Sequence, residues 1–507
     1  MYRLDLSAIE QYACKGKRLE LNDDLIHQIE ASFSFLKEFS SDKIIYGINT
    51  GFGPMAQFKI DDDKLNQLQY NLIRSHSSGT GKVLDDESVR AVLVARINNF
   101  LQGNSGVSYP VIEQLTTFLN EEIYPEIYEH GGVGASGDLV QLAHLALNLI
   151  GEGYVKYKGE RRPTMEVLNE LGIKPLKIEL RDGLGLMNGT SCMSGLGAIN
   201  LIYAYRLLNW GIASSSIINE VVEAYDDSFS VGLNRVKLHE GQMYVADQMR
   251  DFLSDSSLIK KREELFSDND VLQNIEFKKK IQEYYSIRCV PQILGPVKET
   301  LDFAKKVVEN EFNSTNDNPI ISVEDQNVYH GGNFHGDYVS LEMDKIKIVV
   351  TKMTMLAERQ LNFLLNSKIN DQFPAFLNMG VLGFNFGLQG MQFTATSTTA
   401  ESQMLSNPMY VHSISNNNDN QDIVSMGTNS AIIAKRVIDN GFQVMAIHMM
   451  AVCQAIDLLD EEKRKLLSSK TMEVYHIIRK VTPHVGEDVA QFENIRNIIE
   501  TLSKTTI

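Results

Sequence analysis

The sequence has few cysteines, and their spacing argues against disulfide and zinc sites. Only Cys14, Cys192, Cys289 and Cys453 occur in 507 residues, and none forms a Cys-x-x-Cys pair. A disulfide framework or a structural zinc site needs cysteines at short, regular spacings. We therefore expect reduced, partly buried thiols, as in a protein that stays inside the cell.

Targeting segments and linkers are also missing. The first residues, Met1–Leu6, contain no apolar signal core, and no later stretch has about 18 uncharged apolar residues. Only 11 prolines occur, and no Ser/Gly/Pro-rich linker separates two halves of the chain. These absences predict a cytoplasmic protein that does not contact a membrane and folds as one cooperative unit.

The chain has fewer basic than acidic residues, which argues against a nucleic-acid partner. The formal net charge is −17 at pH 7, whereas phosphate binding requires a basic face. With 43% hydrophobic and 22% charged residues, the chain has the composition of an ordinary globular protein.

Helical periodicity dominates what is present. The segment 139–150 is nearly all apolar and is followed by Gly151, a helix-stop signal. The segment 342–366 carries apolar residues at three- and four-residue spacing. The segment 430–459 is apolar on most sides, so we expect it to be buried in a bundle or against other subunits.

Two further segments refine this prediction. In 189–225 small residues alternate with apolar ones, which favours close approach of two helices. Strand-like alternation is scarce, and 154–157, before Lys158-Gly159, is the best candidate hairpin. The patterns predict a mainly α protein built on a long-helix bundle (176–507), with a smaller N-terminal part (1–175).

The glycine-rich run 131–138, which leads straight into the predicted helix at Leu139, admits several interpretations. It matches the Gly-x-Gly-x-x-Gly dinucleotide fingerprint, but the preceding residues 125–130 make a poor strand. It lacks the last glycine of a nucleophile elbow, because Asp138 stands there. Ser136 or Asp138 could also be an ordinary helix N-cap.

A fourth interpretation is chemical. The Gly137 nitrogen could attack the Ala135 carbonyl, a step that requires a residue without a side chain and a sharply bent backbone. Loss of water from the ring and from the Ser136 hydroxyl would leave a methylidene-imidazolone, an electrophile that no unmodified side chain supplies. Nearby helix N-termini would favour the negative charge that develops when an amine adds. These three residues alone leave the choice open.

Several separated motifs resemble those of one enzyme family. They are, in order, 46–53 (YGINTGFG), 74–79 (RSHSSG), 134–138 (GASGD), 186–190 (LMNGT), 285–288 (YSIR), 316–319 (NDNP), 332–335 (GNFH) and 420–426 (NQDIVSM). The chain is similar to the aromatic amino acid ammonia-lyase and aminomutase family over roughly 44–459. Because that family cyclises Ala-Ser-Gly to a methylidene-imidazolone, the resemblance favours the fourth interpretation and a helical fold of the histidine ammonia-lyase type.

The resemblance implies a role for each matching residue. Tyr46 matches the catalytic base, and Arg288 matches the residue that forks onto the substrate carboxylate. Residues 135–137 match the source of the prosthetic group. The other matching positions orient the substrate or contact that group: Tyr285, which we expect to be catalytic, and Asn188, Gln282, Phe334, Asn420 and Gln421. On a helix, Tyr285 and Arg288 would share a face because they are three residues apart.

The selectivity for the aromatic ring is implied by two positions. His76-Ser77 stands where the family reads the far end of the ring, and a histidine there can hydrogen-bond a phenol. Histidine lyases also carry Ser-His here, but they typically have glutamate where this chain has Gln421. The resemblance is therefore closest to tyrosine ammonia-lyases, which convert L-tyrosine to trans-p-coumarate and ammonia. Histidine ammonia-lyase and tyrosine 2,3-aminomutase are the alternatives.

The resemblance also implies the assembly and the cofactors. Family members are homotetramers whose active sites take residues from neighbouring subunits. They need no metal, and His330 and His335 lack a His-Glu-x-x-His pattern, so we expect structural histidines. A catalytically dead helical scaffold is the alternative from another class; the joint presence of all the motif residues argues against it.

Overall fold

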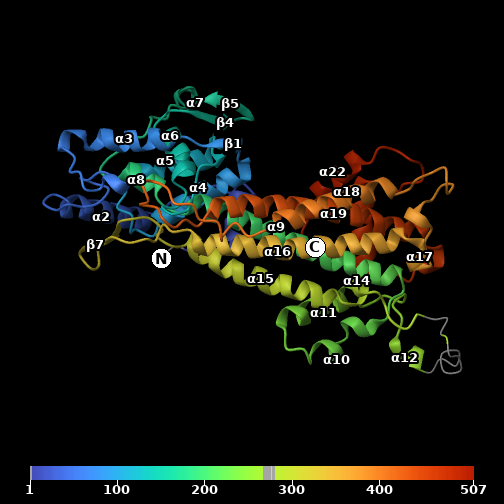
Figure 1. The fold of residues 1–507 in the computed structure, drawn as a ribbon. Helices are drawn as coiled ribbons and strands as arrows, with labels where there is room; N and C mark the ends of the chain where they lie inside the picture. Colours follow the sequence, from blue (N-terminus) through green and yellow to red (C-terminus); the bar gives the residue numbers. More distant parts are fainter. Residues whose placement is uncertain (1–2, 267–275, 277–279) are drawn as a thin grey trace. The chain divides into compact units, whose positions relative to one another are not determined.

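The computed structural model describes residues 3–266, 276 and 280–507 and is mainly helical, which confirms the predicted fold class (Figure 1). The chain forms two compact units. Unit 1 comprises 1–202, 304–344 and 408–435, and unit 2 comprises 203–303, 345–407 and 436–507. The division of the chain at residue 175 stays a prediction.

Unit 1 combines short helices with three small antiparallel sheets, whose strand orders are β1-β3, β2-β4-β5 and β6-β7. Its α-helices are α1 (Leu6–Ala13), α2 (Asp23–Phe39), α3 (Leu65–His76), α4 (Asp86–Phe100), α5 (Tyr109–Asn120), α6 (Leu139–Leu149), α7 (Thr164–Leu171) and α8 (Asp182–Met187). Its strands are β1 (Thr80–Val83), β2 (Tyr124–Pro125), β3 (Tyr128–His130), β4 (Tyr154–Tyr157), β5 (Glu160–Pro163), β6 (Ile320–Ser322) and β7 (Asn327–Tyr329).

The expected hairpin is present as β4 and β5, which pair antiparallel with Tyr157 opposite Glu160. Its two-residue turn has positive φ at both Lys158 (52°) and Gly159 (82°). This is the turn geometry that matches the twist of the flanking strands. The hairpin prediction is therefore confirmed.

Four long helices contain residues of both units (Figure 1). They are α9 (Ser191–Val221), α15 (Val290–Phe312), α16 (Asp337–Leu365) and α19 (Gly427–Leu458). Three of them coincide, to within a few residues at each end, with segments predicted from periodicity. α19 is long and apolar enough to cross a membrane, but 83% of its most apolar window is buried within the protein, as in an ordinary core helix.

The remaining elements belong to unit 2. They are α10 (Val231–Asn234), α11 (Glu240–Phe252), α12 (Arg262–Phe266), α14 (Tyr285–Arg288), α17 (Ser367–Asn370), α18 (Gln389–Leu405), α20 (Glu461–Arg464), α21 (Ser469–Val481) and α22 (Phe492–Lys504). Short 3₁₀ turns lie at Gly53–Met55 and Asp62–Lys64 in unit 1, and at Asp226–Phe229 and Ala375–Leu377 in unit 2.

Within unit 1, α9 approaches α4 backbone to backbone. All residues of α4 from Ser88 to Phe100 are buried. A Cβ added at Gly195 on α9 would lie 2.8 Å from the carbonyl carbon of Ala91 and from the nitrogen of Val92. The prediction that small residues in this segment allow close helix packing is therefore confirmed for α9 and α4.

Replacing Gly195 by alanine should therefore destabilise the protein. The added methyl group meets backbone atoms of α4, which cannot rotate away, and overpacking of this kind costs about 1–3 kcal/mol. Thermal denaturation should show a clearly lower Tm. The control is Gly232→Ala in the exposed helix α10, where an added Cβ meets no atom within 4 Å. Equal Tm values for the two variants would contradict this packing.

Candidate active site

The glycine-rich loop before α6 has the sharp bend that cyclisation would require. Gly137 has φ +70°, and an added Cβ would lie 2.0 Å from the carbonyl oxygen of Gly189. The Asp138 N–H donates to that same oxygen at 2.8 Å. Only glycine fits at position 137, since a side chain would meet both a strained φ and a backbone atom.

Two further chain segments hold the loop from its other side. The Val133 carbonyl accepts from the N–H of Met426 at 2.9 Å. The Gly134 carbonyl accepts from the N–H of Gly336 and from the hydroxyl of Ser425, each at 3.1 Å. Helices α16 and α19 begin directly after these segments, so their N-termini, like that of α6, start beside the loop. Helix N-termini favour negative charge placed near them.

Asp138 ties the loop to two of these helix starts. Its buried carboxylate accepts from the N–H of Met193, in the first turn of α9, at 2.8 Å. It also accepts from the hydroxyl of Thr428 in the first turn of α19. Burial raises the pKa of Asp138 to about 6, although these hydrogen bonds oppose the shift. The carboxylate therefore anchors α9 and α19 at the residue where α6 begins.

Two of the predicted substrate-binding residues donate hydrogen bonds to Ser136. The side-chain amide of Asn188 donates to the Ser136 carbonyl at 3.1 Å. The amide of Gln421 donates to the Ser136 hydroxyl at 3.3 Å. The Asn188 Oδ1 atom is buried and has no hydrogen-bond partner among the described residues. Unit 1 therefore brings together Ala-Ser-Gly, Asn188 and Gln421, and leaves one buried acceptor beside them.

The predicted base lies in its own glycine-rich turn. The half-buried Tyr46 hydroxyl accepts from the N–H of Gly53 at 3.2 Å, and the Phe52 ring stands edge-on to it, with centroids 6.3 Å apart. No hydrogen bond among the described residues joins Tyr46 to Ser136. The backbone N–H places a donor on the oxygen that would carry negative charge in a phenolate.

The expected ring-reading residues end helix α3. His76 Nδ1 lies 3.0 Å from the carbonyl of Leu72, and the Ser77 hydroxyl donates to Ile73 O at 2.8 Å. The Ser75 hydroxyl lies 3.0 Å from the same nitrogen, so the donor and acceptor roles at Nδ1 depend on the tautomer. In the tautomer in which Nδ1 donates to the Leu72 carbonyl, Nε2 is an acceptor for a phenol hydroxyl.

Gln282, Tyr285 and Arg288 belong to unit 2. The Arg288 guanidinium carbon lies 4.3 Å from the centre of the Tyr285 ring, which confirms that the two share a face of α14. Arg288 also donates to the carbonyl of Glu283 at 2.6 Å. Tyr285 is 71% exposed, which is unusual for a residue with a predicted catalytic role.

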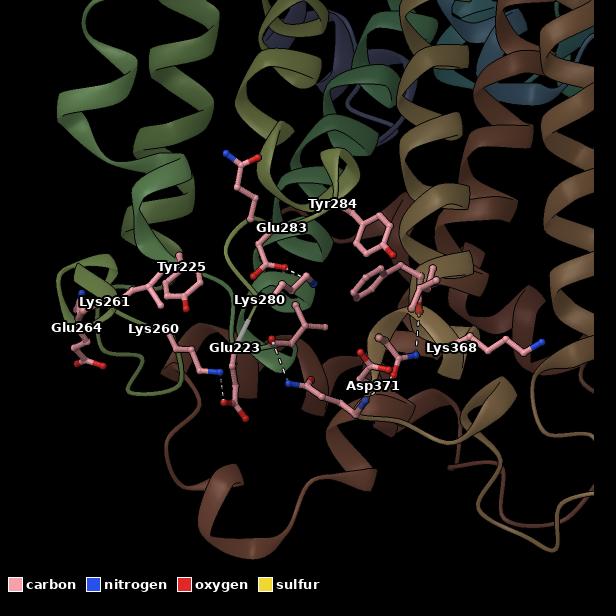
Figure 2. A pocket seen from close by; sticks show the side chains of 17 residues that line it. Glu223, Tyr225, Lys260, Lys261, Glu264, Lys280, Glu283, Tyr284, Lys368 and Asp371 are labelled. Atoms are coloured by element: carbon pink, nitrogen blue, oxygen red, sulfur yellow. Dashed lines mark hydrogen bonds and ion pairs between the residues drawn. The ribbon is translucent and has the colours of Figure 1, made fainter. Parts of the chain in front are cut away.

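A cavity of about 770 Å³ lies beside this segment in unit 2 (Figure 2). Gln282, Glu283 and Tyr284 contribute to its lining. Figure 2 shows Lys280 turned toward Glu283, and the two groups form an ion pair of 2.6 Å. The lysine Nζ also lies 5.2 Å from the centre of the Tyr284 ring. Gln282, a predicted substrate-binding residue, therefore lines a polar cavity.

The last predicted residues have fewer contacts. Phe334 is half-buried in the loop before α16, and Asn420 is exposed, with its N–H donating to the carbonyl of Asn417 at 3.1 Å. Within residues 3–266, 276 and 280–507, no three His, Cys, Asp or Glu side chains cluster as a metal site would require. His335 instead lies 3.6 Å from Asp337.

Two charged residues near the loop were not among those predicted from the sequence. Arg96 is fully buried in α4 and donates to the carbonyl of Asn188 at 2.8 Å. Glu311 in α15 accepts from the Thr190 hydroxyl at 2.5 Å, and burial raises its pKa to about 7. A charged residue inside an apolar helical stretch was the available signal for Arg96.

The chain is similar to known proteins over most of its length. A family model described as "Aromatic amino acid lyase" matches residues 4–480. A tyrosine 2,3-aminomutase from Chondromyces crocatus is 39% identical over 462 residues, which cover 90% of this chain and 86% of that protein. A tyrosine ammonia-lyase from Cupriavidus metallidurans is 38% identical over 450 residues, covering 88% and 84%. The structure of tyrosine aminomutase from Streptomyces globisporus superposes with a TM-score of 0.95 at 34% identity, covering 99% and 95%.

Glu311→Gln should change the pH dependence of stability. The pKa of Glu311 is raised to about 7 in the folded protein, from an ordinary value of 4.5. The folded state therefore holds a proton that the unfolded chain releases, and this stabilisation is lost as pH rises from about 4.5 to about 7. Denaturation midpoints across that window should decline less in the variant than in the wild type. Parallel curves would contradict the assignment.

Proposed function

The chain belongs to the aromatic amino acid lyase family, and on that premise we propose that it eliminates ammonia from L-tyrosine to give trans-p-coumarate. The observation that carries the proposal is the convergence of Asn188 and Gln421 on Ser136 of the Ala-Ser-Gly loop. These residues lie beside helix N-termini, where negative charge is favoured.

The loop fits the prosthetic group that the family makes from Ala-Ser-Gly. Ring closure needs a sharply bent backbone at a residue without a side chain. Gly137 meets this need, because an added Cβ would clash with the carbonyl oxygen of Gly189. A methylidene-imidazolone formed from 135–137 would supply an electrophilic carbon for the substrate amine. Asn188 would hold it through the hydrogen bond to the Ser136 carbonyl, which becomes the ring carbonyl, whereas the bond from Gln421 ends when the Ser136 hydroxyl leaves as water.

The other residues bind the substrate and move a proton. Tyr46 removes the β-proton, and the N–H of Gly53 stabilises the charge on its oxygen. The buried Asn188 Oδ1 accepts a hydrogen bond from the substrate ammonium group. Arg288 forks onto the substrate carboxylate with two parallel hydrogen bonds, a geometry that lysine lacks.

The choice of tyrosine rests on His76 and Gln421. The Nε2 acceptor of His76 takes the phenol hydroxyl, and a substrate without that hydroxyl leaves it unpaired. Gln421 presents a neutral amide, so it lacks the carboxylate that would suit a histidine substrate. Tyrosine therefore fits these two residues better than phenylalanine or histidine.

We propose that the site is shared between copies of the chain. Tyr285 is 71% exposed, and it lies with Gln282 and Arg288 in unit 2, whereas the loop lies in unit 1. The unit 2 residues of a neighbouring copy complete each site in a cytoplasmic homotetramer.

A second candidate function is tyrosine 2,3-aminomutase. The observation that favours it is the similarity to the Chondromyces crocatus protein of that name. The elimination is the same in both reactions, but a mutase retains the ammonia and adds it back at the β-carbon. Product retention depends on how tightly the site closes.

Incubation with tyrosine, phenylalanine and histidine, followed by chromatography and mass spectrometry, tests these alternatives. We expect coumarate from tyrosine, and a protein mass about 36 Da below that of the sequence because cyclisation removes two waters. Ser136→Ala should keep the fold, show no mass loss and lose nearly all turnover.

Other outcomes would revise the proposal. Accumulation of β-tyrosine would favour the mutase, and urocanate from histidine would overturn the assignment of the ring. An inactive wild type of unreduced mass would indicate a catalytically dead scaffold.

His76→Phe should shift the preference from tyrosine toward phenylalanine. A site built to bond a hydroxyl discriminates strongly, so the ratio of kcat/KM for tyrosine over phenylalanine should fall by about 100-fold or more. His27→Phe, at an exposed position of α2, is the matched control and should leave the ratio unchanged. An unchanged ratio in the His76 variant would mean that this residue does not read the ring.

A further inference from the structure

A second histidine of unit 1, His144, links the loop-bearing helix to the turn that follows His76. His144 lies on α6, which begins immediately after the Ala-Ser-Gly-Asp sequence, and its side chain is almost fully buried. Its Nε2 atom accepts from the N–H of Gly79 at 2.9 Å. Gly79 is three residues beyond His76, and the Ser78 N–H donates to the His76 carbonyl at 2.8 Å, so the turn between them is tight.

Packing around Gly79 leaves this turn little freedom. A Cβ at Gly79 would lie 3.0 Å from His144 Nε2 and 3.1 Å from the carbonyl oxygen of His130. The next residue, Thr80, pairs with His130 where β1 meets β3. The turn is therefore confined between α6 on one side and β3 on the other.

The surroundings also restrict His144 itself. The Tyr128 ring of β3 stands edge-on to the imidazole, with centroids 5.0 Å apart and an interplanar angle of 62°. The side-chain amide of Gln141, one turn earlier on α6, donates to the carbonyls of Tyr128 and Glu129 at 3.3 and 3.4 Å. These contacts fasten α6 to β3, so the imidazole has a fixed position from which to hold Gly79.

The hydrogen bond works in one protonation state only. An N–H donor requires an acceptor, so Nε2 must be unprotonated and the neutral ring carries its hydrogen on Nδ1. Burial lowers the pKa of His144, and the carboxylate of Glu126 opposes this shift. The neutral form therefore persists at physiological pH.

We propose that His144 is a positioning residue for substrate selectivity, which holds the His76 turn at a set place relative to the loop that carries Ser136. The proposal rests on the proposed function, in which Ser136 supplies the reactive end of the site and His76 reads the ring. His144 touches neither reacting atoms nor substrate. It acts by fixing one end of the site against the other, and small misplacements of such groups reduce rates strongly.

Two substitutions separate the hydrogen bond from the volume of the side chain. His144→Gln retains a side-chain acceptor, whereas His144→Leu fills similar space without one. We expect the leucine variant to raise KM for tyrosine about tenfold, the scale of one lost hydrogen bond, and to change kcat/KM for phenylalanine less than twofold. The glutamine variant should restore most of the preference for tyrosine.

A double-mutant cycle tests the route through His76. If His144 acts through that residue, His144→Leu should have no further effect on the tyrosine-to-phenylalanine ratio in the His76→Phe background. Additive losses, or an equal loss for both substrates, would overturn the proposal. Both His144 variants should keep the mass loss of about 36 Da, because the electrophile is not involved.

Amide hydrogen exchange tests the proposal independently of activity. The Gly79 N–H should exchange faster in His144→Leu and stay protected in His144→Gln; unchanged protection in the leucine variant would overturn the proposal. A wild type that fails to act on tyrosine would defeat the proposed function while leaving this result standing. If His144→Leu does not fold, Gly79→Ala replaces it, since the new methyl group pushes the turn away from His144 and should lower the same ratio.

Discussion

The buried carboxylate of Asp138 accepts hydrogen bonds from the first turns of α9 and α19, and Asp138 is itself the N-cap residue of α6. Without such an acceptor, groups at these helix starts would be buried and unpaired, at a cost of about 1–3 kcal/mol each. The loop 131–138 owes its conformation to this convergence, because its carbonyls are held by the segments before α16 and α19. The position of Ser136 therefore depends on the N-termini of α6, α9 and α19, which Asp138 joins.

Charged side chains buried in unit 1 cost desolvation free energy. Arg96 and Arg181 are both fully buried, and Arg181 pairs with the buried Asp317 at 3.2 Å. Burial lowers the pKa of Arg96 to about 10, which measures how strongly its charge is desolvated. Buried ion pairs rarely add net stability, but breaking one is strongly destabilising. Arg96 determines the shape of the site, because it holds the Asn188 carbonyl and Asn188 in turn holds Ser136.

The residues of the proposed site differ in how they are held. The groups at Ser136 are held by buried partners, whereas Tyr285 and Gln282 of unit 2 are exposed in the single chain. A site completed by a neighbouring copy would combine a half that is buried in the single chain with one that becomes buried on assembly. On this view, selectivity depends on the first half, since His76 and its turn are fastened to the same unit that carries the loop.

Much of this could be predicted from the sequence. The long helices and the 154–163 hairpin follow from spacing that acts within a few residues, and the reactive tripeptide is contiguous. Arg96, Glu311 and His144 could not be assigned in this way, because their partners come from distant segments. The sequence by itself determined the helices and the contiguous Ala135-Ser136-Gly137, since both depend on neighbouring residues, and the resemblance to the family is what favours cyclisation of that tripeptide. Only the tertiary structure decided that Asn188 and Gln421 meet Ser136 and that His144 meets Gly79, because these contacts join residues 52, 285 and 65 positions apart.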